Sequence, residues 1–106
     1  LVSQDELIEM ARKYSTNDML ILDVRSAEEF AEGHIKNAVN ISHDEMSRNF
    51  MSILEFQDKP VVVYCRSGRR ANIAETILKD KGFTKVMHLE GDMNDWVDAE
   101  LPVENE

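Results

Sequence analysis

Short apolar runs alternate with amphipathic stretches along the chain, and this alternation predicts strands and helices in turn. The apolar runs are nearly continuous, which is typical of strands that are covered on both faces. They predict strands over Met19–Val24, Ala38–Ile41, Val61–Cys65 and Lys85–Leu89. Strands that alternate with helices favour an α/β fold, in which a small, mainly parallel sheet carries helices on both faces. Such sheets place functional sites at the carboxyl ends of their strands.

Serine-led segments mark where several of the helices should begin. Ser3–Glu6, Ser26–Glu29 and Ser42–Glu45 each have a glutamate three residues after the serine, which is the signature of a capping box. A further helix is predicted over Ala71–Lys81, and Gly91 permits a turn into a short last segment. Four acidic residues at helix starts are interpreted as solvated: Glu28, Glu29, Asp92 and Asp95.

The size and charge of the chain narrow the classes of function. Its 106 residues suffice for one domain with one core, and we expect a single domain over residues 1–106. No apolar run approaches the length that spans a bilayer, so no membrane partner is expected. The net charge of −9 argues against nucleic-acid binding, which needs a basic face. A reactive thiol fits a reducing cytoplasm, while a periplasmic location or a place in a larger protein stays open.

Cys65 is the only cysteine of the chain, and it stands at the end of a predicted strand. The segment Cys65–Arg70, called the Cys65 loop below, contains one glycine and three arginines and leads directly into a predicted helix. Gly68 lets the backbone curl so that N–H groups point at the sulfur, where they favour a thiolate over a thiol. Such a thiolate either attacks a sulfane sulfur and carries it as a persulfide, or attacks phosphorus in a phosphate ester.

Motifs spread along the chain follow one another in a characteristic order. They are Leu22–Arg25, Glu28–Phe30, Glu32–Ile35, Ala38–Ile41, Val63–Ala71, Gly82–Phe83, Leu89–Gly91 and Trp96. From about Ser3 to Trp96 the chain therefore resembles the single-domain rhodaneses, a family of thiosulfate-type sulfurtransferases. Asn37 and Asp92 depart from the pattern, because the family commonly has glycine there. Asparagine tolerates a left-handed backbone, whereas aspartate after Gly91 is expected to reshape the turn near the pocket.

The resemblance implies a role for each residue of the Cys65 loop. Cys65 would be the catalytic sulfur acceptor, and the loop would cradle the persulfide. The implied substrate-binding residues are Arg66, Ser67, Gly68, Arg69 and Arg70. Asp23 and Arg25 match a family pair that supports the site. Which arginine contacts the donor stays open at this stage.

The resemblance also indicates the reaction partners. It implies a small anionic sulfur donor, such as thiosulfate or a persulfide, and a thiol or cyanide acceptor, with a protein acceptor left open. It implies no cofactor. No metal site is predicted, because His34, His43 and His88 lack the paired spacing of zinc ligands. We expect a monomer or a weak dimer.

Two other functions remain as alternatives. Cysteine-based phosphatases and arsenate reductases of the same fold have one more residue between the cysteine and the arginine of the loop. Here Arg70 lies five positions after Cys65, so the smaller loop favours sulfur over phosphate. A non-catalytic regulatory module is the second alternative. The presence of Cys65 argues against it, because inactive members of the family commonly lose this residue.

Overall fold

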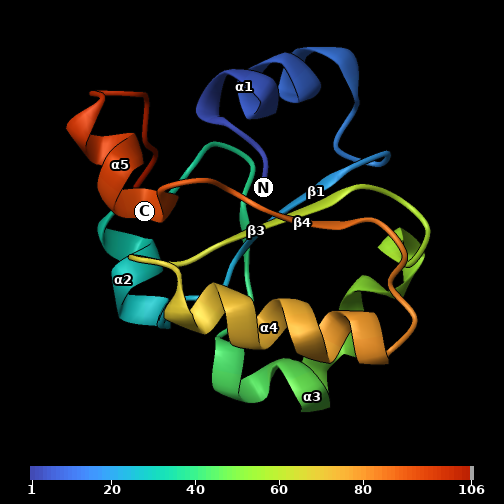
Figure 1. Cartoon of the computed structure of the whole chain (residues 1–106). Coiled ribbons are helices and arrows are strands. Elements are labelled where there is room, and N and C mark those ends of the chain that lie inside the picture. Colours follow the sequence, from blue (N-terminus) through green and yellow to red (C-terminus); the bar gives the residue numbers. More distant parts are fainter. Residues whose placement is uncertain (106) are drawn as a thin grey trace.

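Four short strands form the centre of the computed structural model, which describes residues 1–105 (Figure 1). The strands are β1 (Leu20–Asp23), β2 (Val39–Asn40), β3 (Val61–Tyr64) and β4 (Val86–His88). The helices are α1 (Gln4–Lys13), α2 (Ala27–Glu32), α3 (Met46–Asn49), α4 (Arg69–Asp80) and α5 (Asp92–Asp98), with 3-10 segments η1 (His43–Glu45) and η2 (Phe50–Phe56). The strands lie in the order β2-β1-β3-β4 and pair in parallel throughout. The predicted α/β fold is confirmed.

Helices cover both faces of the sheet, and the side chains of β3 alternate between them. Val61 and Val63 belong to the apolar cluster formed with α3, η2 and α4, while Val62 and Tyr64 belong to the cluster formed with α1 and α5. All four side chains are fully buried. Figure 1 shows α1 on one side of the strands and α3 and α4 on the other. A strand enclosed in this way has no polar side, which explains its continuous apolar sequence.

Two of the three predicted capping boxes are present. Ser3–Glu6 and Ser26–Glu29 each have both reciprocal hydrogen bonds between the serine and the glutamate. The third prediction, at Ser42–Glu45, is wrong. The N–H of Glu45 donates to the carbonyl of Ser42 at 2.9 Å, so it is not available to the serine hydroxyl. The chain forms the 3-10 turn η1 at this point instead of the start of an α-helix.

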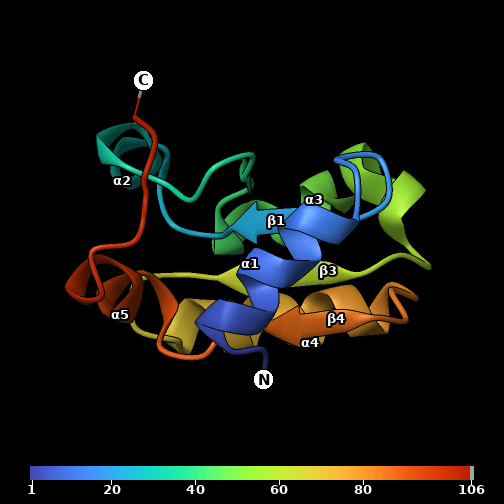
Figure 2. The ribbon, with the colours of Figure 1, turned by 90° about the horizontal axis from the view of Figure 1, so that it is seen from above.

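The parallel topology brings the carboxyl ends of β1 and β3 to one edge of the sheet. Asp23 at the end of β1 pairs with Tyr64 at the end of β3, and Cys65 is the next residue. α4 begins at Arg69, two residues before the predicted Ala71, so the turn out of β3 is short. In Figure 2, α2 and α5 lie beyond the carboxyl ends of the strands. This edge therefore holds the arrangement of strand ends and helix starts in which parallel sheets build their sites.

Asn37 and Asp92, the two departures from the rhodanese pattern, both have left-handed backbone. Their φ angles are +68° and +53°. After glycine, asparagine and aspartate are the residues that adopt this conformation most readily. Both positions therefore combine a left-handed turn with a polar side chain.

Candidate active site

The Cys65 loop folds its backbone over the sulfur of its own cysteine. Cys65 directly follows β3 and has only 1% of its surface exposed. The N–H of Gly68 donates to the Cys65 Sγ at 3.0 Å. Gly68 has a φ of +124°, which a residue with a side chain rarely adopts, so the loop requires glycine at this point. One N–H of the predicted nest therefore lies on the sulfur.

The first turn of α5 holds the same loop by its carbonyl groups. The N–H of Met93 donates to the carbonyl of Cys65 at 3.0 Å, and the N–H of Asn94 donates to the carbonyl of Arg66 at 3.1 Å. The first N–H groups of a helix have no partner within the helix. Here the N–H groups of Met93 and Asn94 bind carbonyl groups of the Cys65 loop, so the start of α5 holds the loop in place.

Asp23 and Arg25 form a buried ion pair at the end of β1. The backbone N–H and Nε of Arg25 donate to Asp23 Oδ1 at 2.9 and 3.1 Å, and Nη2 donates to Oδ2 at 2.7 Å. Nη2 also donates to the carbonyl of Gly33 at 2.6 Å. Burial opposes the charge of Arg25, but the hydrogen bonds and the charge of Asp23 outweigh it and raise the pKa of Arg25. The pair links the end of β1 to the end of α2.

Arg70, the last residue of the Cys65 loop, is bound by Glu29 of α2. Its Nη1 and Nη2 donate to the two carboxylate oxygens of Glu29 at 2.7 and 3.0 Å. These bonds lower the pKa of Glu29 to about 2, and the hydrogen bonds with Ser26 act in the same direction. The same contact raises the pKa of Arg70. The interpretation of Glu29 as a solvated acid is therefore wrong, because this carboxylate neutralises an arginine of the loop.

This ion pair predicts how stability depends on pH. A carboxylate whose pKa falls on folding stabilises the folded state above its unfolded pKa, and the effect is lost as the pH falls through the folded pKa. Glu29→Gln should lower the free energy of unfolding by about 1 kcal/mol near neutral pH. Its difference from the native protein should shrink as the pH falls from about 4.5 to about 2. Urea unfolding, followed by the fluorescence of the single tryptophan, measures the loss at neutral pH and its decrease at acid pH.

Glu28→Gln is the matched control for this experiment. Glu28 is exposed in the same first turn of α2, so its substitution removes an equal charge without touching Arg70. We expect no change in stability at either end of the pH range. A difference between Glu29→Gln and the native protein that stays constant from neutral to acid pH would contradict the assignment.

The other two arginines of the loop are placed differently. Arg66 and Arg69 are exposed, and no ion pair within residues 1–105 involves them. Arg66 also lines a cavity of about 280 Å³, whose other charged residues are Arg25, Glu29, Glu32 and Asp98. Ser67 is exposed as well. Positive charge that an anion can reach at this loop is thus carried by Arg66 and Arg69.

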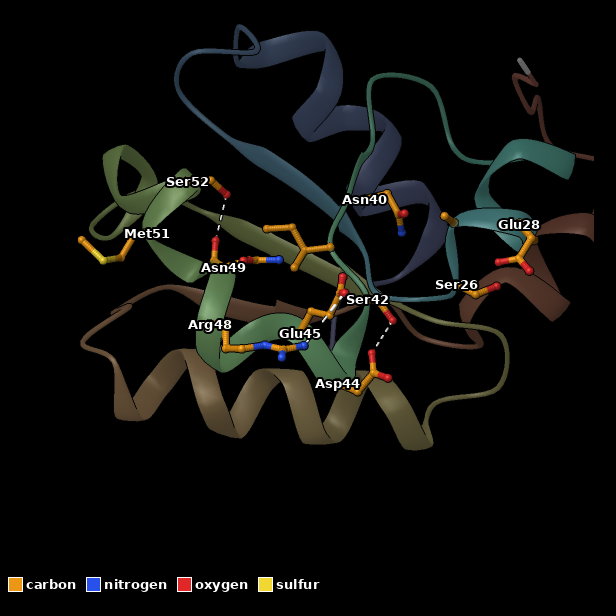
Figure 3. Close-up of a pocket in the computed structure, with 12 residues that line it drawn as sticks. Ser26, Glu28, Asn40, Ser42, Asp44, Glu45, Arg48, Asn49, Met51 and Ser52 are labelled. Atoms are coloured by element: carbon orange, nitrogen blue, oxygen red, sulfur yellow. Dashed lines mark hydrogen bonds and ion pairs between the residues drawn. The ribbon is translucent and has the colours of Figure 1, made fainter.

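A hollow of about 740 Å³ lies near the same edge of the sheet but does not include the Cys65 loop. Figure 3 shows the carboxylates of Glu28, Asp44 and Glu45 around it. Its lining has one arginine, Arg48, which lies 4.0 Å from Glu45. A hollow with three carboxylates and one arginine does not suit an anion.

The three histidines lie in separate surroundings. His34 Nδ1 lies 2.8 Å from the carbonyl of Phe30, and His88 contacts Asp92. His43 Nδ1 is buried without a hydrogen-bond partner in the described part of the chain. Among residues 1–105, no group of three or more His, Cys, Asp or Glu side chains could hold a metal ion. Over the same residues, no helix has both the length and the apolar character to cross a membrane.

A family model decides how the chain is classified. The model described as the rhodanese-like domain matches residues 3–99, which is nearly the whole chain. The chain belongs to the rhodanese-like family. The resemblance inferred from the motifs is thus confirmed, and the membership supports an enzyme of the sulfurtransferase type.

Two curated relatives that match this chain are much longer than it. It is 37% identical over 93 residues to a probable molybdopterin-synthase adenylyltransferase from Porphyra purpurea, covering 88% of this chain and 23% of that protein. It is 34% identical over 94 residues to a tRNA uridine(34) hydroxylase from Escherichia coli, covering 81% and 27%. The chain thus spans about a quarter of the length of these curated relatives. A solved structure, a rhodanese-related protein from Thermoplasma volcanium, matches with a TM-score of 0.82 at 30% identity over 99% of this chain and 97% of that one.

Asp92, like Glu29, is an acidic residue of this site whose surroundings the sequence pattern predicts wrongly. It is interpreted above as solvated, yet it is 3% exposed, and its Oδ1 accepts a hydrogen bond from the N–H of Cys65 at 2.9 Å. The sequence did indicate that Asp92 is unusual, because it replaces a glycine of the family pattern. Glu29 gave no such signal. It fits an ordinary capping box, and nothing in the spacing indicates that it also reaches Arg70, 41 residues away.

Proposed function

We propose that this chain is a sulfurtransferase that carries a sulfane sulfur on Cys65 as a persulfide. The donor is thiosulfate or a persulfide, and the acceptor is cyanide or a thiol of a small molecule or a protein. The observation that carries the proposal is the N–H of Gly68 donating to the Sγ of a cysteine at the carboxyl end of β3. A donor in this position stabilises negative charge on the thiolate and on the persulfide that replaces it.

The proposed reaction consists of two displacements at sulfur. In the first, the Cys65 thiolate attacks the outer sulfur of thiosulfate, the S–S bond of thiosulfate breaks, and sulfite leaves with the electron pair. In the second, cyanide attacks the outer sulfur of the persulfide, and thiocyanate forms as the Cys65 thiolate departs. A thiolate acceptor reacts in the same way and becomes a persulfide. Neither step needs an external oxidant or reductant, and the intermediate is covalent.

The burial of Cys65 supports a slim electrophile. With 1% of the residue exposed, a donor has to reach the sulfur with a terminal atom. The outer sulfur of thiosulfate or of a persulfide is such an atom. A phosphate ester presents a tetrahedral phosphorus with three further oxygens, and it needs a wider loop than the six residues Cys65–Arg70 provide.

The charges of the loop support an anionic donor. Arg70 is neutralised by Glu29, so Arg66 and Arg69 are the arginines that we assign to the attraction of the donor. Both are exposed at the rim of the loop, where they add a local positive field to a chain of net charge −9.

The native protein itself tests the proposal. After incubation with thiosulfate, intact-mass measurement should show one added sulfur atom, and addition of cyanide should remove it as thiocyanate. A parallel incubation with an aryl phosphate should release no phosphate. Phosphate release without sulfur uptake would favour the phosphatase alternative instead. If the protein neither takes up sulfur nor releases phosphate, a non-catalytic binding module is favoured.

A further inference from the structure

A buried polar chain connects the Cys65 loop to β4 and α4. Asp92 Oδ1 accepts from the N–H of Cys65 at 2.9 Å and lies 2.8 Å from His88 Nε2. The other ring nitrogen of His88 lies 3.2 Å from the side-chain amide of Asn72. Asp92 and His88 are 3% and 8% exposed. Asn72 is exposed, but water cannot replace the buried contacts of Asp92, so losing one of them leaves a buried polar group unsatisfied.

The backbone at Asp92 would suit glycine better than aspartate. Its φ is +53°, directly after Gly91 at +79°. Glycine adopts this conformation without the steric cost that a Cβ brings. The turn therefore does not explain the aspartate, whereas the contacts of its carboxylate do.

The carboxylate of Asp92 touches both ends of the turn that encloses the sulfur. Oδ1 holds the N–H of Cys65, and Oδ2 lies 3.1 Å from the point where a Cβ on Gly68 would be. The N–H of Gly68 is the group that donates to the Cys65 Sγ. We propose that Asp92 is a positioning residue, which fixes the peptide of Cys65 and packs against Gly68 so that the Gly68 N–H stays on the sulfur. This inference rests on the proposed function, because its consequence is the rate at which Cys65 takes up sulfur.

Three variants test the inference. Asp92→Gly suits the left-handed backbone and removes every contact of the carboxylate. Asp92→Asn keeps an oxygen that can accept from the N–H of Cys65. Asp95→Asn is the matched control, because Asp95 is exposed in the first turn of the same helix, α5. Thermal unfolding of each variant is measured first, so that uptake rates refer to folded protein.

We expect the rate of sulfur uptake by Asp92→Gly to fall about tenfold, the size of effect that one lost hydrogen bond produces. The rate is followed by intact mass in a single turnover. The thiosulfate concentration that gives half of the maximal rate should stay unchanged, because Asp92 does not contact the donor. Hydrogen exchange at the amides of Cys65 and Gly68 should accelerate by about tenfold or more. Asp92→Asn should recover both properties to within about threefold, and Asp95→Asn should match the native protein.

Sulfur uptake by Asp92→Gly at the native rate would overturn the inference, and so would unchanged exchange at both amides. If Asp92→Gly does not fold, Asp92→Ser takes its place, because a serine hydroxyl is one bond shorter and does not span the gap to the N–H of Cys65. If the native protein takes up no sulfur, the proposed function fails. The exchange of the two amides still decides whether Asp92 holds the loop.

Discussion

Alanine in place of Cys65 is expected to leave a folded protein that takes up no sulfur. Without the thiolate, no bond to the sulfane sulfur can form, and the two-step reaction loses its covalent intermediate. Thiocyanate formation from thiosulfate and cyanide should fall by about 10³-fold or more, to the rate of the uncatalysed mixture. Intact mass after incubation with thiosulfate should show no added sulfur atom.

The loss of activity can be attributed to the missing thiolate only if the Cys65→Ala variant still folds. Cys65 is 1% exposed, and removal of its sulfur from the core should cost about 1 kcal/mol. Cys65→Ser is close to cysteine in size and serves as a second variant that also lacks a sulfur carrier. The fluorescence of the buried Trp96 reports the fold of both. Sulfur uptake by either variant would refute Cys65 as the carrier.

Replacing Arg25 by methionine is expected to cost about 3–5 kcal/mol of the free energy of unfolding. The carboxylate of Asp23 is fully buried, and Arg25 is its ion-pair partner. Methionine fills the space but leaves this charge without a cation. Because the whole domain is stabilised by only about 5–15 kcal/mol, the loss is a large part of its stability. Urea unfolding measures it directly.

Two further variants separate charge from packing in this experiment. Asp23→Leu combined with Arg25→Met removes both charges, so the double variant should be more stable than Arg25→Met alone. Arg48→Met removes an arginine whose side chain is 73% exposed and pairs with Glu45 at the surface. It should change stability by less than about 0.5 kcal/mol. Equal losses in Arg25→Met and in the double variant would show that lost packing, rather than the unpaired carboxylate, causes the effect.

The central strands β1 and β3 were predictable from the sequence because they are buried at every position and are almost entirely apolar. Each predicted strand agrees with the structure to within one residue at either end, as Met19–Val24 does with β1 (Leu20–Asp23). The segment after Ser42 was not predictable in the same way. A serine with a glutamate three residues later satisfies the capping-box pattern, but the same spacing also fits a 3-10 turn, and the backbone bond from Glu45 to Ser42 decides between them.

The place of Cys65 at the end of a strand was predictable from local features, whereas its surroundings were not. Cys65 is followed by glycine and arginines within six residues, so the pattern of the site lies in one short segment. The contacts of Glu29 with Arg70 and of Asp92 with Cys65 span 41 and 27 residues. Such contacts depend on which strand ends and helix starts the topology brings together. Periodicity along the chain carries no information on that.

The carboxylate of Glu29 serves two elements at once. Its Oε1 accepts from the N–H of Ser26 at 3.0 Å, which closes the start of α2, and from Arg70 Nη1 at 2.7 Å. Fraying of the first turn of α2 therefore loosens the partner of Arg70 and exposes the guanidinium charge at the Cys65 loop. The positive charge available at the Cys65 loop is thus coupled to the helix–coil equilibrium at the start of a six-residue helix at the edge of the fold.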